Sequence, residues 1–171
     1  MTLPARTTVR PDLPHAVAVI GDGEYSFCAA HALTWPETFE PLHGHTFMVQ
    51  LELGGDLDAT SGGIMDFGAI KRALRDVIKP LRRRTLLAAD APGVEHVVDG
   101  GQVRFGRGAK TYCLPIEDVV MLPIVNTTTE AIAWYLLDQL EPVLRRPGVA
   151  WARLRLAEAP DVAATVHRDL T

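Results

Sequence analysis

The stretch His43-Gly-His-Thr-Phe-Met-Val-Gln-Leu-Glu-Leu53 decides the fold that the sequence predicts. From residue 46 onward apolar residues alternate with other residues, and alternation of period two is typical of a strand with one buried face. The face predicted to be buried carries Phe47, Val49, Leu51 and Leu53. Side chains two positions apart on a strand point the same way, so His43 and His45 can converge on one point.

On the N-terminal side of this strand, the sequence predicts two further strands. Residues 15–20 form an apolar run, and Gly21-Asp-Gly23 supplies turn chemistry for a hairpin with a second strand at residues 24–33. Residues 1–14 are expected to form a loose arm without the apolar region of a secretory signal. Residues 35–42, with two prolines, are expected to form a loop.

Two amphipathic helices are predicted on the C-terminal side. The first is expected to be capped by Asp66 and to bury apolar residues at three-and-four spacing, namely Phe67, Ile70, Leu74, Val77, Ile78 and Leu81. The second begins at Asn126-Thr-Thr-Thr-Glu130, where Thr127 and Glu130 have the spacing of a capping box.

The order of these elements predicts an α+β fold. A last strand at residues 149–158, with Ala152, Leu154 and Leu156 inward, completes a four-stranded antiparallel sheet with both helices on one face. Residues 95–123, between the helices, are interpreted as an inserted β-hairpin. A length of 171 residues fits a single domain, predicted to run from residue 15 to residue 171.

Composition and charge exclude several classes of function. The chain is 47% hydrophobic and 22% charged, as in ordinary globular proteins, and a formal net charge of −4 leaves no basic surplus for nucleic acid. No apolar run approaches the ~20 residues that span a bilayer, so no membrane partner is expected. Two cysteines, Cys28 and Cys113, are too few for a disulfide framework and indicate a reduced, cytoplasmic setting.

Three histidines are the candidate metal ligands. His31 lies near the end of the strand predicted before His43 and His45, and pairing of the two strands would bring the three imidazoles together. Three neutral imidazoles with one open coordination position form a catalytic type of zinc site, in which the metal polarises an oxygen or activates water. The alternative is that His-Gly-His is merely a polar start to a strand.

Glu158 is a further candidate functional residue. It has the parity of Leu154 and Leu156 and is therefore predicted to point inward at a strand end, where a buried carboxylate needs a partner or a ligand. The alternative is a strand-end glutamate that turns back to solvent.

Taken together, these motifs resemble the 6-pyruvoyl-tetrahydropterin synthase / 6-carboxy-tetrahydropterin synthase family. The likeness runs from Tyr25 to His167, and its matching segments are residues 27–33, 42–47, 63–67 with Lys71, 126–130 and 154–158. The resemblance implies a T-fold, in which trimers stack as a homohexamer with active sites at subunit contacts. It also implies a small-molecule dihydropterin as substrate.

The resemblance also implies roles for the candidate residues. Zinc is expected on the three histidines, where it holds side-chain oxygens of the substrate. Glu158 matches the glutamate that anchors the pterin ring, and a carboxylate suits that ring because it can accept two parallel N–H hydrogen bonds. Thr128 and Thr129 match substrate-binding hydroxyls beside the pocket, and simple helix capping is an alternative that can hold at the same time.

The position of the catalytic residue departs from the usual family pattern. The family's usual nucleophile or base is a cysteine, and Phe39 stands in its place here. One branch, associated with cleaving the side chain of dihydroneopterin triphosphate, instead uses a glutamate three residues before His-Gly-His, which corresponds to Glu40. A carboxylate beside a zinc-bound hydroxyl can serve as a general base, so Glu40 is the predicted catalytic residue. The alternative is an exposed loop acid.

A second departure follows the first helix. The family's proton-relaying Asp-His pair is replaced by arginine in the run Arg82-Arg83-Arg84, and arginine cannot act as a base near neutral pH. These arginines either clamp phosphates or form the solvated end of a helix, and the solvated interpretation is favoured. Cys28, at an odd offset from His31, is expected to point away from the metal and to be buried. His96 is the best candidate for a replacement relay, with a surface position as the alternative.

The leading hypothesis is a zinc-dependent lyase that acts on a dihydropterin such as dihydroneopterin triphosphate, by side-chain cleavage or phosphate elimination. Loss of the cysteine and of the Asp-His pair favours the alternative, a pterin- or heterocycle-binding protein without turnover. A purely structural zinc site is disfavoured, because three histidines leave one coordination position open.

Overall fold

The computed structural model describes residues 15–21 and 23–171, so the arm predicted for residues 1–14 lies outside the described residues. The strands are β1 (His15–Ile20), β2 (Ser26–His31), β3 (His43–Asp56), β4 (Arg84–Ala88), β5 (Glu95–Asp99), β6 (Gln102–Arg107), β7 (Lys110–Pro115), β8 (Val119–Leu122), β9 (Val149–Ala159) and β10 (Val162–Asp169). The helices are α1 (Phe67–Ile78) and α2 (Thr129–Leu144). Within the described residues, neither helix has the length and apolar character needed to cross a bilayer.

The main sheet is mixed and has seven strands, in the order β10-β9-β3-β2-β4-β8, with β1 also paired to β3. The pairs β2–β4 and β4–β8 are parallel, and the other pairs in this sheet are antiparallel. The expected four-stranded, purely antiparallel sheet is therefore corrected, whereas the α+β class is confirmed. The connection from β3 to β4 runs through α1, and such a crossover lets β4 join the sheet parallel to β2.

β3 is the strand around which the others pair. β1 and β2 both pair with it antiparallel and lie end to end, from His15 opposite Asp56 to His31 opposite His43. The predicted hairpin between these two strands is wrong, because the chain passes from β1 into β2 along β3 and does not reverse. On its other side β3 pairs with β9, which turns back into β10, a strand that the sequence analysis did not identify.

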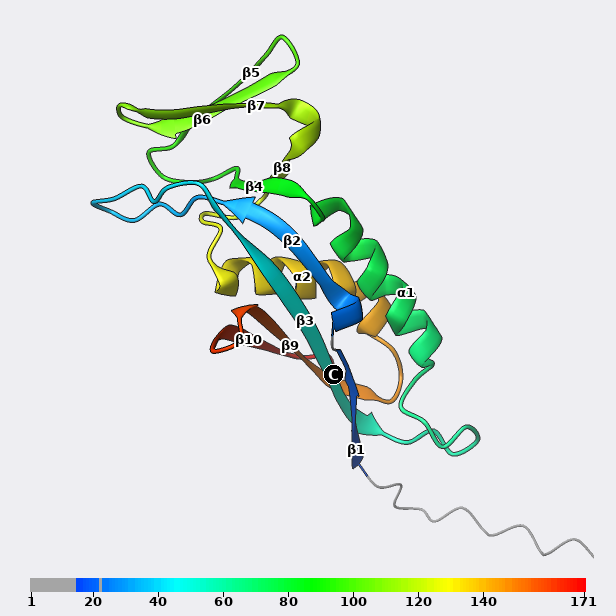
Figure 1. Ribbon diagram of the computed structural model, residues 1–171. Helices are drawn as coiled ribbons and strands as arrows, with labels where there is room; N and C mark the ends of the chain where they lie inside the picture. Colours follow the sequence, from blue (N-terminus) through cyan, green and yellow to red (C-terminus); the bar gives the residue numbers. More distant parts are fainter. Residues whose placement is uncertain (1–14, 22) are drawn as a thin grey trace, which may run out of the picture.

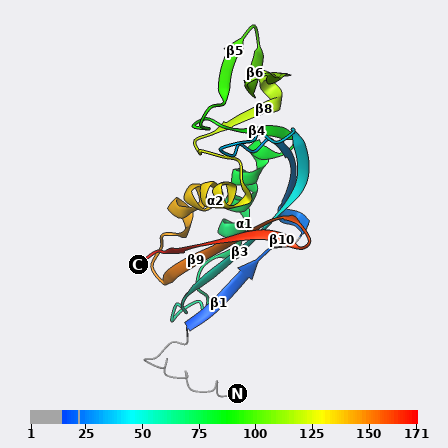
Figure 2. The same cartoon turned by 90° about the vertical axis from the view of Figure 1, so that its left-hand side faces the viewer.

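The inserted segment forms a small sheet of its own. The predicted hairpin is corrected to three antiparallel strands, β5-β6-β7, after which β8 returns to the main sheet beside β4. Figures 1 and 2 show this small sheet standing beyond the two helices, next to the loop that links β2 to β3. The division of the chain into an arm, one domain and an insertion at residues 95–123 stays a prediction.

Both helices cover the same face of the main sheet (Figure 2). Each of them begins at a side-chain cap. Asp66 accepts hydrogen bonds from the backbone N–H groups of Gly68 and Ala69, so the predicted cap of α1 is confirmed. The cap of α2 is Thr128 and not Thr127, because the Oγ1 atom of Thr128 accepts from the N–H of Ala131.

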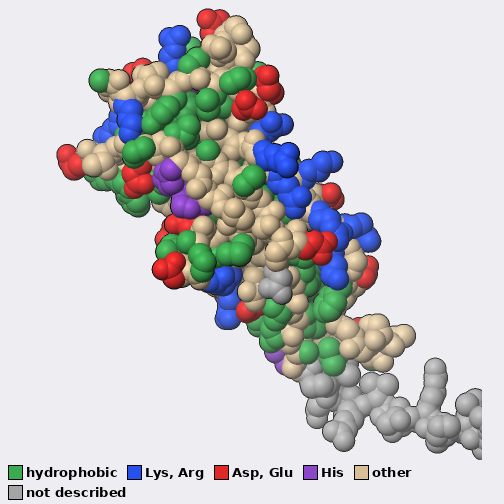
Figure 3. Space-filling model, viewed as in Figure 1, with side chains coloured by type: hydrophobic (Ala, Val, Ile, Leu, Met, Phe, Trp, Pro, Cys, Tyr) green, Lys and Arg blue, Asp and Glu red, His purple; other side chains and the backbone are tan. Residues whose placement is uncertain are grey.

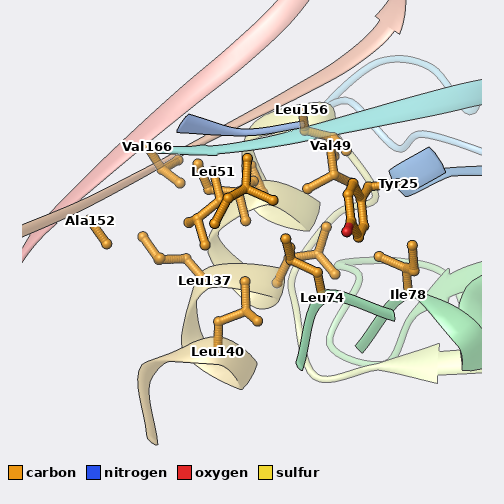
Figure 4. Close-up of a cluster of buried hydrophobic side chains, with 14 of the residues drawn as sticks. Tyr25, Val49, Leu51, Leu74, Ile78, Leu137, Leu140, Ala152, Leu156 and Val166 are labelled. Carbon is orange, nitrogen blue, oxygen red and sulfur yellow. The ribbon is translucent and has the colours of Figure 1, made fainter. Parts of the chain in front are cut away.

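The hydrophobic core lies between the helices and the main sheet (Figure 4). Leu51 of β3 and Leu156 of β9 meet Leu74 of α1 and Leu137 of α2 there. Leu51, Leu154 and Leu156 are fully buried, which confirms the parity predicted for β3 and β9. Side chains two positions apart on a strand lie on the same face. The face of β3 that enters the core with Leu51 therefore carries His43 and His45 at the start of the strand.

Candidate functional site

Three histidines meet where β2 ends and β3 begins. The antiparallel register sets His31 opposite His43 and Ala29 opposite His45. The centre of the His31 ring lies 4.6 Å from that of His43 and 5.2 Å from that of His45. One nitrogen of each ring lies within 4.8 Å of the other two, close enough for the three rings to share one metal ion.

Backbone carbonyl groups fix the protonation of two of these rings. Nδ1 of His31 lies 2.7 Å from the carbonyl oxygen of Thr127, and Nδ1 of His43 lies 2.8 Å from that of Pro41. A carbonyl oxygen only accepts, so both Nδ1 atoms carry hydrogen and donate. In a neutral imidazole the lone pair is then on Nε2, which stays free to bind a metal.

The Nε2 atom of His31 shows whether this donor set fits a metal ion. The side chain is only 1% exposed, and Nε2 has no hydrogen-bond partner among the described residues. A buried polar atom without a partner is costly, and a cation would satisfy it. Burial also lowers the pKa of His31, which favours the neutral form that metals require. The histidines therefore fit a divalent cation such as zinc.

A cavity of about 310 Å³ opens beside the histidines. Its lining combines residues from five elements (β2, β3, α2, β9 and β10) and one loop, and it includes His31, His43, Glu40, Glu158, Thr128 and Thr129. His45, the third histidine of the cluster, does not line this cavity. Its ring lies edge-on to the rings of His31 and His43. On the left of Figure 3, histidine atoms reach the surface close to acidic side chains. The volume is in the range of small-molecule binding sites.

Glu158 is held by a neighbouring hydroxyl group. Its Oε2 atom accepts a hydrogen bond of 2.5 Å from Oγ1 of Thr129, the first residue of α2. This bond orients the half-buried carboxylate and leaves its Oε1 atom available to a ligand in the cavity. Thr128 uses its own hydroxyl to cap α2, so the two adjacent threonines have different partners.

Glu40 reaches the same cavity from the loop between β2 and β3. Its Oε1 atom accepts a hydrogen bond of 2.7 Å from Nε1 of Trp35, and its backbone N–H donates to the carbonyl oxygen of Leu33. These bonds hold the half-buried carboxylate at the cavity wall. The structure thus brings Glu40 to the cavity that His31 and His43 also line.

Cys28 and two of the arginines lie elsewhere. Cys28 is exposed, so its predicted burial is wrong, because its odd offset from His31 puts it on the outer face of β2. There it lines a second cavity, of about 660 Å³, together with Arg83 and Arg84. Both roles considered for the arginines, a phosphate clamp and a solvated helix end, remain predictions.

Sequence reasoning missed three contributors to the site. Thr127 supplies a carbonyl oxygen to His31, and Trp35 supplies an N–H to Glu40. Arg107 donates hydrogen bonds to the loop on which Trp35 and Glu40 lie. A backbone carbonyl has no sequence signature, and the other two contacts depend on tertiary structure. His96, the candidate relay, lies in β5 and is not part of the lining of the histidine cavity.

The fold and the site together define a T-fold protein with a three-histidine cluster beside an acidic pocket. The chain belongs to the 6-pyruvoyl tetrahydropterin synthase family, whose sequence model matches residues 22–169. The resemblance inferred from the motifs is therefore confirmed, and it places the chain in a family of pterin-processing enzymes.

Individual relatives agree with this assignment. A Methanocaldococcus jannaschii protein, provisionally named 6-carboxy-5,6,7,8-tetrahydropterin synthase, is 27% identical over 135 residues, which are 77% of this chain and 83% of that protein. The dihydroneopterin monophosphate aldolase of Pyrococcus furiosus is 38% identical over 73 residues, 42% of this chain and 61% of the aldolase.

Solved structures show the same architecture. The crystal structure of 6-pyruvoyl tetrahydropterin synthase from Plasmodium vivax superposes with a TM-score of 0.87 at 28% identity, over 91% of this chain and 99% of that one. The same P. vivax enzyme has been solved as a catalytic-residue mutant with a glutamate replaced by alanine.

Proposed function

We propose that this protein is a zinc-dependent lyase that acts on a dihydropterin such as dihydroneopterin triphosphate, by side-chain cleavage or phosphate elimination. The observation that carries the proposal is one cavity that joins the histidine cluster to two carboxylates, Glu40 and Glu158. Family membership supports a pterin as the class of substrate. The aldolase relative supports carbon–carbon cleavage, and the catalytic glutamate of the P. vivax enzyme supports a carboxylate base.

His31, His43 and His45 would hold the zinc ion, in line with the free Nε2 atom of His31. When bound, zinc supplies Lewis acidity toward an oxygen of the substrate side chain. The neutral imidazoles leave the net positive charge of the ion unchanged, so an incoming oxygen meets the full charge.

The two carboxylates have separate tasks in this proposal. Glu158 accepts two N–H hydrogen bonds from the amino-pyrimidinone edge of the pterin, and Thr129 keeps the carboxylate oriented for them. Glu40 removes the proton of a side-chain hydroxyl group as the adjacent carbon–carbon bond breaks, and the carbon that bore this hydroxyl leaves as an aldehyde. The electron pair of the broken bond passes to the pterin ring, and the proton held by Glu40 then returns to the carbon that stays attached to the ring. Trp35 holds Glu40 at the cavity wall during this step.

A binding protein without turnover is the second candidate function. The replacement of the family's Asp-His pair by arginine favours it, since Arg83 faces the second cavity and offers no base to the first. Both candidates share the pocket and the metal, so they differ only in whether product forms.

Product analysis separates the two functions. Zinc-loaded protein is incubated with dihydroneopterin triphosphate, and products are followed by chromatography with fluorescence detection. We expect a product whose formation is abolished in Glu40→Gln while zinc content stays at the wild-type level. Binding of the pterin without any product would select the second function, and full activity of Glu40→Gln would mean that the base lies elsewhere.

We also propose that the protein is a cytoplasmic homo-oligomer, a trimer or hexamer. Family membership supports the assembly, and the two free cysteines support a reducing compartment. Light scattering coupled to size-exclusion chromatography measures the assembly directly, and a monomeric mass at micromolar concentration would contradict it.

A further inference from the structure

The loop that carries Glu40 folds back on itself before it enters β3. We call residues 32–42 the Glu40 loop. The N–H of Trp35 donates to the carbonyl oxygen of Thr38 at 2.8 Å, and Thr34 and Phe39 form an isolated antiparallel bridge. This small turn lies next to the inserted sheet (Figure 1). Its position therefore depends on whatever holds it from that side.

Arg107, the last residue of β6, donates into this turn from the inserted sheet. Its Nη1 atom donates to the carbonyl oxygen of Trp35 at 2.5 Å, to Oγ1 of Thr34 at 3.2 Å and to the carbonyl oxygen of Thr38 at 3.4 Å. Its Nη2 atom donates to the carbonyl oxygen of Pro36 at 2.7 Å. A guanidinium group presents several N–H donors in one rigid plane, which a lysine ammonium does not.

β7 holds the other end of the Glu40 loop. Nζ of Lys110 donates to the carbonyl oxygen of Phe39 at 3.2 Å, and the hydroxyl group of Tyr112 accepts from the N–H of Leu42 at 3.0 Å. Phe39 and Leu42 pack in a second apolar cluster with Tyr112 and Phe105, whose rings stack at 5.2 Å. The loop and the inserted sheet thus share hydrogen bonds and a small core.

We propose that the inserted sheet is a brace for the Glu40 loop, and that Arg107 is a positioning residue for the Glu40 carboxylate. Arg107 acts through Trp35, whose carbonyl oxygen it binds and whose indole N–H donates to Glu40. The brace keeps the carboxylate within reach of a hydroxyl group held beside the histidines. Misplacement of a catalytic group by about 1 Å can cost on the order of 100-fold in rate. This inference rests on the proposed role of Glu40.

The first test observes the loop without any reaction. The chain has three tryptophans, and 5-fluorotryptophan labelling makes Trp35 visible by ¹⁹F NMR beside Trp134 and Trp151. We expect Arg107→Met and Arg107→Lys to shift or broaden the Trp35 resonance and to leave the other two in place. Arg104→Met, a matched loss of an exposed arginine from the same strand, should change none of the three. An unchanged Trp35 resonance in Arg107→Met, or equal changes at all three tryptophans, would overturn the brace.

The second test separates positioning from substrate binding. In zinc-loaded Arg107→Lys we expect kcat to fall by roughly tenfold or more, with KM within about twofold of wild type and zinc content unchanged. Tyr112→Phe, which removes one hydroxyl group and no charge, should lower kcat in the same direction by a smaller factor. A rise of KM with constant kcat, or full activity of Arg107→Lys, would contradict a positioning role.

The two tests keep this inference apart from the proposed function. If the wild-type protein binds pterin and forms no product, the lyase proposal fails, and the Trp35 resonance still decides whether Arg107 orders the loop. If the wild-type protein is active and Arg107→Lys is equally active, the lyase proposal stands and the brace is rejected.

Discussion

Thr129, in the first turn of α2, donates a hydrogen bond of 2.5 Å from Oγ1 to Oε2 of Glu158 in β9. The two residues are 29 positions apart in the sequence, and Thr129 is only 8% exposed. The bond links the start of α2 to the end of β9 and fixes the orientation of the Glu158 carboxylate. Thr128, the preceding residue, bonds only to the backbone of its own helix in the described structure. The pair of threonines therefore allows binding and capping to be separated.

Thr129→Val should weaken the binding of a dihydropterin by about 5- to 10-fold, because loss of one hydrogen bond to a carboxylate is worth on the order of 1 kcal/mol or more. Fluorescence titration with 7,8-dihydropterin measures the change in Kd. Thr128→Val is the matched control, and we expect it to lower the free energy of unfolding by about 1 kcal/mol with little change in Kd. Equal weakening of pterin binding by both substitutions would show that the two hydroxyl groups share one role.

His31→Gln should lower the affinity for zinc by more than about tenfold, because the substitution removes a ligand whose ring is already oriented by Thr127. Competition with a chromophoric chelator measures the affinity, and elemental analysis measures the bound metal. His167→Gln removes an imidazole that lies outside the cluster, against Asp169, and should leave both values unchanged. Wild-type zinc content in His31→Gln would exclude His31 from the metal site.

Asp66→Ala should lower the free energy of unfolding by about 1 kcal/mol, because it removes the side chain that accepts from two N–H groups at the start of α1. Urea denaturation followed by circular dichroism measures the change. Asp76→Ala, an exposed substitution later in the same helix, should stay within about 0.5 kcal/mol of wild type. If Asp66→Ala and Asp76→Ala lower the free energy of unfolding equally, the hydrogen bonds that Asp66 accepts at the start of α1 add no stability beyond the effect of its negative charge.

The parts of the fold that follow a regular hydrophobic pattern could be predicted from the sequence. The alternation from Phe47 to Leu53 and the parity of Leu154 and Leu156 set the buried faces of β3 and β9 correctly. The turn chemistry of Gly21 and Gly23 was misleading, because a turn motif does not say whether the next strand pairs with its predecessor or follows it along a third strand. Parallel pairing of β4 likewise depends on the crossover through α1.

The candidate site could be predicted only where spacing alone brings side chains together. His43 and His45 are two apart on one strand, and His31 needs only the pairing of adjacent strands. Arg107 reaches the Glu40 loop from a segment about 70 residues later, and no local pattern indicates such a contact. The capping-box spacing indicated Thr127 as the cap of α2, whereas the observed cap is Thr128. The carbonyl of Thr127 instead accepts from His31, a tertiary contact that a capping motif does not encode.

The end-to-end arrangement of β1 and β2 along β3 has a consequence for how this protein can change in evolution. The register of β1 and β2 against β3 determines which side chains of β3 are buried and which face of the sheet carries the imidazoles. A slip by one residue would exchange the two faces along the entire strand. A change in register would therefore move Leu51 out of the core and His45 out of the metal site at the same time. An insertion or deletion between His45 and Leu51 that no bulge absorbs would move one of these two side chains to the opposite face of the sheet. We therefore expect changes in length to fall in the connections between strands and not in this part of β3.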